Sequence, residues 1–431
     1  MGARESTQQE ANALIRNEHE CESSVNIDMT KLVEKVPECC IYKVPDPLRK
    51  LNEEAYNPQV ISIGPFHHDH GNKKLQTMEK YKVKYLEAFL ERVKINMEDL
   101  KQIVKDSKES ICQRYAETFT DLSSDDHFVT MIVTDACFII ELFLRNKFTQ
   151  WTSEDKIVLK PWLATKMQLD LILLENQLPF SIIDKLFERA FASRPVPTSL
   201  VELSFEYFQN YNSQKMSLDP ELEILHFSDL LRNFYLPPRR PLPNRKLKTV
   251  EHMYSATQLD GVGLKFEVDL SSNCLLDLDL HLDWKKRVLK IPRFTLDNET
   301  EHCVRNLLAL EQCHYPNKTH ITDYFILLDF LIKSEKDVDL LRQQRIVVSG
   351  FDNKQTTNFI NNLGTSMIYS TMSPKYYDIC IKLKKFYENP SWPEYIRRTC
   401  FSTLLRMAAL TVTILTLIQT VCSLISVIPH H

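Results

Sequence analysis

Apolar residues recur along most of this chain at the three- and four-residue spacing of α-helices. The clearest case lies between residues 75 and 104, where one apolar face of a long helix is formed by Met78, Tyr81, Tyr85, Phe89, Val93, Met97 and Leu100. The stretch 127–144 is apolar on nearly every side and follows the capping candidates 123–126. This stretch therefore predicts a helix at the centre of the fold.

Two prolines divide the next helical pattern. Pro161 suits the first turn of a helix, which is predicted to run over residues 161–177. Pro179 then separates it from a following helix over 181–191, because proline cannot continue the helical hydrogen-bond ladder. Helical spacing returns after residue 300 and continues to about residue 389.

One segment of the second half has the period of two that is typical of strands. Four leucines (Leu276, Leu278, Leu280, Leu282) alternate there with four polar residues (Asp277, Asp279, His281, Asp283). Residues 288–292 are expected to pair back across the basic turn 284–287, and 261–270 is a third candidate strand. We therefore predict a mainly α fold: a large helical body with a small antiparallel β insertion in the second half and one C-terminal transmembrane helix.

The transmembrane prediction rests on the run Met407–Ile428, which contains no Asp, Glu, Lys or Arg. As a helix its 22 residues would reach about 33 Å, enough to cross the hydrocarbon core of a membrane. Upstream lie aromatic residues suited to an interfacial belt and a group of arginines: Trp392, Tyr395, Arg397, Arg398 and Arg406. The alternative is a buried C-terminal helix, although such helices rarely stay uncharged for so long.

These patterns divide the chain into parts. Residues 1–40 are polar and poor in aromatic residues, so we expect a disordered tail. A single helical domain is expected over 41–398, and a membrane anchor over 400–429. The domain would comprise a helical first half, a proline-rich basic linker, and a small sheet with further helices, at 41–232, 233–250 and 251–398 respectively. The spacing of Pro238 and Pro241 also fits a polyproline ligand, but a semi-rigid connector is the simpler interpretation.

Composition disfavours several classes of function. Only 7 of 431 residues are glycine, and no glycine-rich phosphate-binding motif is present. A net charge of −4 gives no general attraction to nucleic acid. The 11 cysteines include no C-x-x-C pair and several lie in apolar helical contexts, which indicates free thiols in a reducing compartment.

Signals for localisation point in two directions. The N-terminal residues lack the apolar segment of a secretory signal, and arginines precede the anchor. We therefore expect a single-pass membrane protein with a cytosolic body, in a plasma membrane or endomembrane. An extracellular body is the alternative, because Asn298 and Asn317 begin glycosylation sequons. Gly2 fits the pattern for N-myristoylation, although this permissive pattern also arises by chance.

Two clusters contain residue types found in metal sites. Asp277, Asp279 and Asp283 could gather a hard cation, but a solvated strand face with cross-strand ion pairs explains them more simply. Residues 67–70 read His-His-Asp-His, whereas zinc usually takes ligands from more than one segment, and no other pair has a suitable spacing. An ordinary loop is the favoured interpretation, and no metal or cofactor is predicted.

Three carboxylates stand within apolar segments. Asp135 and Glu141 lie in the predicted central helix, and Glu175 lies near Pro179. A buried carboxylate must be paired, protonated or functional. These acids could form an acid–base or metal site, or each could accept backbone donors or pair with an arginine such as Arg49 or Arg305. We favour structural pairing, since no cleft signature accompanies them.

Several long motifs, in order, resemble one known family. They are IYKVPDPLRKLNEEAYNPQVISIGPFHH, MIVTDACFIIELF, DLILLENQLPF, the stretch from SATQL to LKFE, IPRFTLDNETEHCVRNLLALEQCH and the apolar C-terminal run. Over about residues 41–425 the chain is similar to the plant domain-of-unknown-function 247 family. The family-like positions are Val44, Pro45, Leu48, Arg49, Asn52, Tyr56, Pro58, Gly64, Pro65, His67, His68, Asp135, Cys137, Phe138, Glu141, Leu142, Glu175, Asn176, Gln177, Pro179, Phe180, Glu311 and Gln312. Asp69 departs from the pattern, because the family commonly has glycine there.

The resemblance implies a single, mainly helical domain with one C-terminal transmembrane segment and no established enzymatic activity. None of the family-like positions is a known catalytic residue. Some grass members are tied to self-incompatibility loci, as candidate recognition determinants. On this basis we expect one polar network to join the helices, with Arg49 neutralising one of its acids; its members would be Asp135, Glu141, Glu175, Asn176 and Gln177.

The expected function is that of a membrane-anchored plant protein that acts through protein–protein recognition or signalling, without catalysis. Its expected partners are a membrane and unidentified proteins, with no nucleic acid and no small-molecule ligand. The alternative is a membrane-associated enzyme that uses the buried carboxylates or the loop of His67, His68 and His70. The two hypotheses differ in whether these groups converge on an open pocket or are enclosed in a packed interior.

Overall fold

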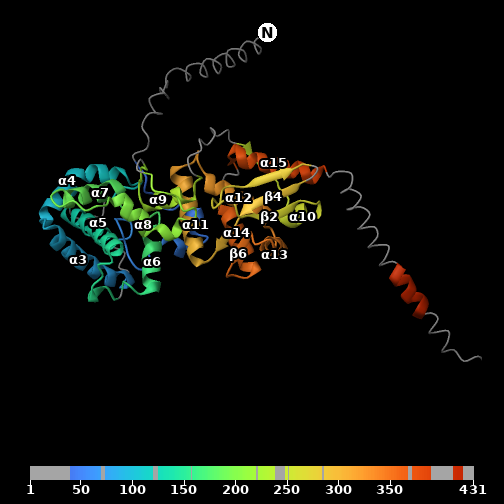
Figure 1. Cartoon of the computed structure of the whole chain (residues 1–431), viewed down its shortest axis with the longest axis horizontal. Helices are drawn as coiled ribbons and strands as arrows, with labels where there is room; N and C mark the ends of the chain where they lie inside the picture. Colours follow the sequence, from blue (N-terminus) through green and yellow to red (C-terminus); the bar gives the residue numbers. More distant parts are fainter. Residues whose placement is uncertain are drawn as a thin grey trace, which may run out of the picture. The chain divides into compact units, whose positions relative to one another are not determined.

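Helix α5 (Asp125–Phe148) is the central element of the first half of the chain, as its all-round apolar pattern predicts. It packs against α3 (Lys73–Val93), α4 (Met97–Gln113), α7 (Phe180–Phe191) and α8 (Leu200–Tyr207), as Figure 1 shows. Its side chains from Phe128 to Arg145 are almost all buried. A helix without a polar face is stable only when other helices surround it.

The computed structural model describes residues 39–68, 73–119, 125–156, 158–219, 222–237, 248–250, 252–283, 286–366, 371–389 and 411–420. Several predictions lie outside these residues. They concern the tail over 1–38 with Gly2, the capping residues 123–124, the prolines 238 and 241, the turn residues 284–285, and the aromatic residues and arginines of 392–406.

The apolar stripe over residues 75–104 belongs to two helices, so the prediction of one long helix is wrong. Helix α3 ends at Val93, and Lys94 adopts a left-handed conformation with φ of 56°. Asn96 then caps α4, because its side chain accepts a hydrogen bond from the backbone N–H of Glu98. The apolar spacing continues across the break, which is why the pattern alone does not reveal it.

Helix α6 (Pro161–Leu171) begins at the predicted proline but ends earlier than expected. The prediction that it runs to residue 177 is wrong, because residues 172–179 form an irregular segment before α7. Shorter elements complete the first half: α2 (Asp46–Arg49), η1 (Glu53–Tyr56), η2 (Ser153–Lys156), η3 (Gln209–Tyr211) and α9 (Phe227–Tyr235). Helix α9 takes up the first residues of the predicted linker.

The second half contains the predicted strands, but the sheet is mixed. Strand β3 (Asp279–Leu282) pairs antiparallel with β4 (Arg287–Pro292), as expected. Strand β2 (Lys265–Asp269) pairs parallel with β4, so the prediction of a purely antiparallel sheet is wrong. Two further pairs are formed by β5 (Phe294–Leu296) with β6 (Val347–Ser349) and by β1 (Lys248–Thr249) with β7 (Thr371–Met372).

Helix α11 (Asn298–His314) connects the two halves of the body. It contacts η1, α6 and α9 of the first half, and α12 (His320–Leu331) and β5 of the second. The remaining helices are α10 (Ala256–Gly261), α13 (Glu335–Gln343), α14 (Asn353–Ser366) and α15 (Pro374–Glu388). The prediction of a mainly helical body with small sheets in the second half is confirmed.

The described part of the apolar C-terminal run is the helix Thr411–Thr420. All ten of its residues are exposed, and Val412 and Leu415 are 64% and 61% accessible to solvent. Among the described helices, α5 alone is long and apolar enough to cross a membrane. Its most apolar window is 83% buried inside the protein, so α5 is a core helix.

Candidate functional site

Glu175 holds the segment that follows the N-terminal tail against the core. The Arg49 guanidinium lies 2.5 Å from Glu175 Oε2, and the backbone N–H of Val44 donates to Oε1. His67 Nε2 approaches the same carboxylate at 3.4 Å. The hypothesis that Arg49 neutralises one of the buried acids is therefore confirmed for Glu175. Burial alone would raise the pKa of Glu175, but the contacts of His67, Arg49 and Val44 outweigh it and lower this pKa.

Asp135 forms a second anchor, between α5 and α3. Its Oδ1 lies 2.7 Å from Lys82 Nζ, and its Oδ2 accepts a hydrogen bond from the backbone N–H of Gly64 at 2.9 Å. Lys82 is completely buried and also lies 2.7 Å from Glu79 Oε1. Burial raises the pKa of Asp135, although the Lys82 ammonium partly opposes this effect. This cation was missed by the sequence analysis.

Glu141 belongs to a separate cluster at the far end of α3. Arg92 binds both of its carboxylate oxygens, through Nε at 2.8 Å and a terminal nitrogen at 2.9 Å. Arg145 adds a third bond through Nε at 2.8 Å and binds Asp155 with its terminal nitrogen. Tyr85 donates its hydroxyl to Asp155 at 2.7 Å. Two arginines and two acids thus join α3, α5 and η2 with their charges matched.

Asn176 and Asp170 bind the extended backbone of residues 59–64. Asn176 accepts from the N–H of Ile63 at 2.7 Å and donates to the carbonyl of Ile61 at 3.0 Å. Asp170 accepts three consecutive backbone N–H groups, from residues 59 to 61, at 2.6 to 3.0 Å. Burial raises the pKa of Asp170 to about 6, against the opposing effect of these donors. These bonds satisfy an irregular buried segment that has no strand partner.

Gln177 performs the same role for the end of α6 and the start of α9. Its Nε2 donates to the carbonyls of Leu171 and Leu173 at 2.6 and 2.8 Å, and its Oε1 accepts from the N–H of Phe227 at 2.9 Å. The expectation of a single polar network among the five residues is therefore wrong. Each side chain binds its own backbone segment or cation: Asp135 and Glu141 point from α5 to different cations on α3, and residues 175–177 bind three different segments.

Glu311 is a further family-like acid that is completely buried. It accepts hydrogen bonds from the Arg232 side chain at 3.2 Å and from the backbone N–H and hydroxyl of Thr322, both at 2.8 Å. Other family-like positions support local structure. Pro45 and Pro179 are the N-cap residues of α2 and α7, Tyr56 and Phe138 are buried aromatic residues, and Gly64 and Pro65 lie in the 59–66 segment. Asn52 donates a hydrogen bond to Glu301, and Gln312 lies near the end of α11.

The two clusters that were considered as metal sites do not converge. Asp277 pairs with Lys375, Asp279 with His281, and Asp283 accepts from the backbone of Lys286. His67 faces Glu175, whereas the His68 ring lies 5.1 Å from the ring of His127. Asp69 and His70 lie outside the described residues. Within the described part of the chain, no three His, Cys, Asp or Glu side chains are placed to share a metal ion.

Arg305, the other cation considered as a partner for the buried acids, pairs instead with Glu301 four residues earlier, at 2.8 Å. The eight cysteines that the structure describes are free thiols, in agreement with the prediction. Asn298 and Asn317 are both exposed, at the first position of α11 and in the loop that follows it. Their exposure is compatible with either topology of the body.

The three acids that the enzyme hypothesis names are enclosed. Asp135 and Glu141 are each 1% exposed and Glu175 is 4% exposed, and each has a cation within hydrogen-bonding distance. A carboxylate that is consumed by an ion pair and shielded from substrate cannot act as a general acid or base without first breaking that pair. Their arrangement stabilises the fold by joining segments that are distant in sequence.

The fold and these ion pairs define a mainly helical protein whose irregular segments are fixed by buried side chains. Residues 41–419 match the family described as plant protein of unknown function, DUF247, and the chain belongs to this family. Among curated proteins it is similar to UPF0481 protein At3g47200 of Arabidopsis thaliana, with 28% identity over 424 residues, covering 90% of this chain and 87% of the relative. No solved structure matches the chain. The family resemblance found in the motifs is confirmed.

Proposed function

We propose that the protein is tethered to a membrane by its C-terminal run and acts through protein–protein recognition, with the body on the cytosolic side. The observation that carries this proposal is the helix Thr411–Thr420, which exposes apolar side chains in all directions. Such a surface is unstable in water and favourable in hydrocarbon. The enclosed carboxylates further favour recognition over catalysis.

An exposed apolar pair on the body supports the recognition part of the proposal. Trp162 is 63% exposed at the start of α6, and Leu159 is 44% exposed three residues earlier. Tryptophan is enriched among the residues that dominate protein–protein interfaces, because it buries a large rigid surface. A photo-crosslinker at position 159 in membranes should give discrete adducts that are lost with Trp162→Ala. The same crosslinker at the exposed position 80 is the control.

Membrane attachment can be tested with charges placed in the anchor. The full chain should remain in the membrane pellet after alkaline carbonate extraction, and Ile414→Arg/Leu417→Arg should release it. The matched control is Leu159→Arg/Trp162→Arg, which adds the same charge at exposed apolar positions of the body and should leave the pellet fraction unchanged. Equal extraction of both double variants would contradict anchoring by this run.

The side of the membrane is tested through the two sequons. With a cytosolic body, glycosidase treatment of the full chain should cause no gel shift, and protease added outside sealed microsomes should digest the body. A shift that disappears in Asn298→Gln/Asn317→Gln would place the body in the lumen or outside the cell. Cell-surface recognition would then replace the cytosolic proposal.

A further inference from the structure

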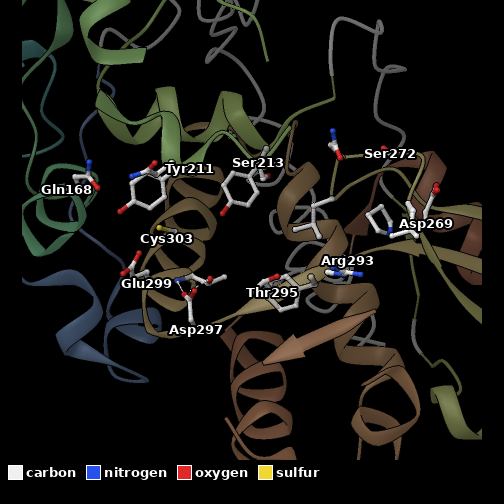
Figure 2. Close-up of a pocket in the computed structure, with 18 of the residues that line it drawn as sticks. Gln168, Tyr211, Ser213, Asp269, Ser272, Arg293, Thr295, Asp297, Glu299 and Cys303 are labelled. Carbon is white, nitrogen blue, oxygen red and sulfur yellow. Dashed lines mark hydrogen bonds between the residues drawn. The ribbon is translucent and has the colours of Figure 1, made fainter. Parts of the chain in front are cut away.

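A cavity of about 520 Å³ lies where the first and second halves of the body meet. Its walls come from α6, η3, the end of β2, the β4–β5 connection and the first turn of α11. Figure 2 shows Tyr211 and Ser213 across the cavity from Thr295, Asp297 and Glu299. Its volume is within the range of small-molecule sites, about 300–1,000 Å³. The sequence carries no local signal for it, because the lining residues come from five separate segments.

Three groups in this cavity have unused hydrogen-bonding capacity. The hydroxyl of Tyr211 is buried and has no hydrogen-bond partner within the described part of the chain. Arg293 and Glu299 also line the cavity; their side chains are exposed to solvent and form no hydrogen bond or ion pair with any described residue. A buried hydroxyl without a partner is unfavourable, so a ligand that supplies one would be stabilised there.

The chemistry of these groups defines the ligand. Arg293 can only donate hydrogen bonds, Glu299 can only accept them, and Tyr211 can do both. A hydroxyl group can match all three, because it donates and accepts at the same atom. We propose that this cavity binds a small neutral polyhydroxylated molecule, a monosaccharide, disaccharide or cyclitol, through Tyr211, Arg293 and Glu299.

The charges of the cavity favour a neutral ligand over a cationic amine. Arg293 and Glu299 have opposite charges. The other two acids are already engaged: Asp297 accepts the N–H and hydroxyl of Thr300, and Asp269 accepts those of Ser271. Apolar side chains such as Leu270, Leu275 and Phe294 line part of the cavity and polar side chains line the rest, so a wholly apolar ligand would leave several polar groups without partners.

The cavity is better suited to binding than to catalysis by cysteine. Cys303 lines it, but burial raises the pKa of its thiol well above the ordinary value. The reactive thiolate is therefore suppressed at neutral pH. This inference is independent of the proposed membrane attachment, since the cavity belongs to the body.

The test uses the full chain in detergent micelles and saturation-transfer NMR with millimolar D-glucose, sucrose and myo-inositol. At least one probe should bind, and Tyr211→Phe and Arg293→Met should each weaken it about tenfold, the effect of losing one hydrogen bond of about 1.4 kcal/mol. Tyr207→Phe is the matched control, because Tyr207 is a buried tyrosine outside the cavity and its substitution should leave binding unchanged.

Three results would overturn the proposal. The first is no saturation transfer from any probe. The second is binding that Tyr211→Phe and Arg293→Met leave unchanged, since it would then lie elsewhere. The third is preferential binding of spermidine, tested in parallel. The probes are used at millimolar concentration because molar sugars stabilise proteins by exclusion from the protein surface, without binding to a site. Sucrose attached to a carrier protein is tested in the same way. Binding of the attached form would indicate the end of a glycan as the ligand, and binding of free sucrose alone would indicate a free sugar.

Discussion

The ammonium of Lys82 and the carboxylate of Asp135 lie 2.7 Å apart, and neither side chain is accessible to solvent beyond 2%. They join α3 to α5, and α3 is the helix that packs most extensively against the central helix. A buried ion pair contributes modestly to stability as a whole, but removing one partner leaves an uncompensated buried charge. The pair is therefore far more sensitive to single substitutions than to the replacement of both residues.

We predict that Lys82→Met lowers the free energy of unfolding by about 3–5 kcal/mol. The double variant Lys82→Met/Asp135→Asn should recover part of this loss, because the amide oxygen can still accept the hydrogen bond from Gly64 without a charge. Chemical denaturation of the full chain in detergent measures both. Lys80→Met is the control on the same helix, since Lys80 is exposed, and should change stability by less than about 0.5 kcal/mol. A lower free energy of unfolding for the double variant than for Lys82→Met would contradict this account.

Gly64 is fixed by its surroundings and by its backbone. Its φ is +72°, and a Cβ atom there would lie 2.4 Å from the carbonyl oxygen of Gln177. That oxygen also accepts the hydroxyl of Tyr115 at 2.9 Å, so it cannot easily move away. We predict that Gly64→Ala destabilises the protein by at least about 2 kcal/mol, from strain and from the displaced contact.

The matched control for this substitution is Gly261→Ala. Gly261 has no atom within 4 Å of the position of an added Cβ and lies at the end of α10. Alanine there should be neutral or slightly stabilising, because it restricts the unfolded chain without a new clash. Thermal melts of the two variants side by side give the comparison, and equal melting temperatures would show that the Gln177 contact is unimportant.

The sequence predicts elements well where one pattern dominates a segment. Helix α5 was found because its long run is apolar on nearly every side, and β3 because its leucines alternate with polar residues. The break at Lys94 was missed because the apolar spacing resumes in phase on the other side. The parallel pairing of β2 with β4 was missed because strand order depends on the path of the chain between them.

The sequence identified only some of the cations that pair with the buried acids. Arg49 was identified through its place in the family motif, whereas Lys82 and Arg92 were overlooked. Yet both have the spacing of the buried stripe, since Lys82 lies four residues after Met78 and Arg92 three after Phe89. A cation on an apolar stripe indicates a buried acid opposite it, and this signal was available in the sequence. The cavity was not, because it exists only after distant segments assemble.

The assignment of Arg49 to Glu175 makes a specific prediction for double-mutant cycles. Arg49→Met and Glu175→Gln should show a coupling energy of about 1–3 kcal/mol, because Glu175 is buried and Arg49 is 23% exposed. Arg49→Met with Glu141→Gln should show coupling below about 0.5 kcal/mol, since Glu141 binds Arg92 and Arg145 instead. Denaturant titration of the six proteins required measures both cycles. Significant coupling in the second cycle, or none in the first, would reverse the assignment.

His226 makes the body sensitive to acid. Its ring is completely buried, with Nε2 3.0 Å from the carbonyl oxygen of Cys40, and Nδ1 accepts the N–H of Asp229 at 3.3 Å. This arrangement requires a neutral ring, because a proton on Nδ1 would face that N–H. Burial lowers the pKa of His226 from 6.5 to about 4, although the charge of Asp229 opposes this effect.

In the interval from pH 6.5 down to about 4 the unfolded chain therefore binds a proton that the folded state does not accept. Stability contributed by the neutral ring is fully present above pH 6.5 and decreases as the pH falls through this interval, by about 3 kcal/mol in total. We predict that His226→Phe, although less stable at pH 7.5, loses less stability than wild type between pH 7 and 4.5. His252→Gln, at an exposed position, should retain the wild-type slope. Unfolding free energies measured across this range decide the matter: parallel curves for wild type and His226→Phe would assign the acid sensitivity to other groups.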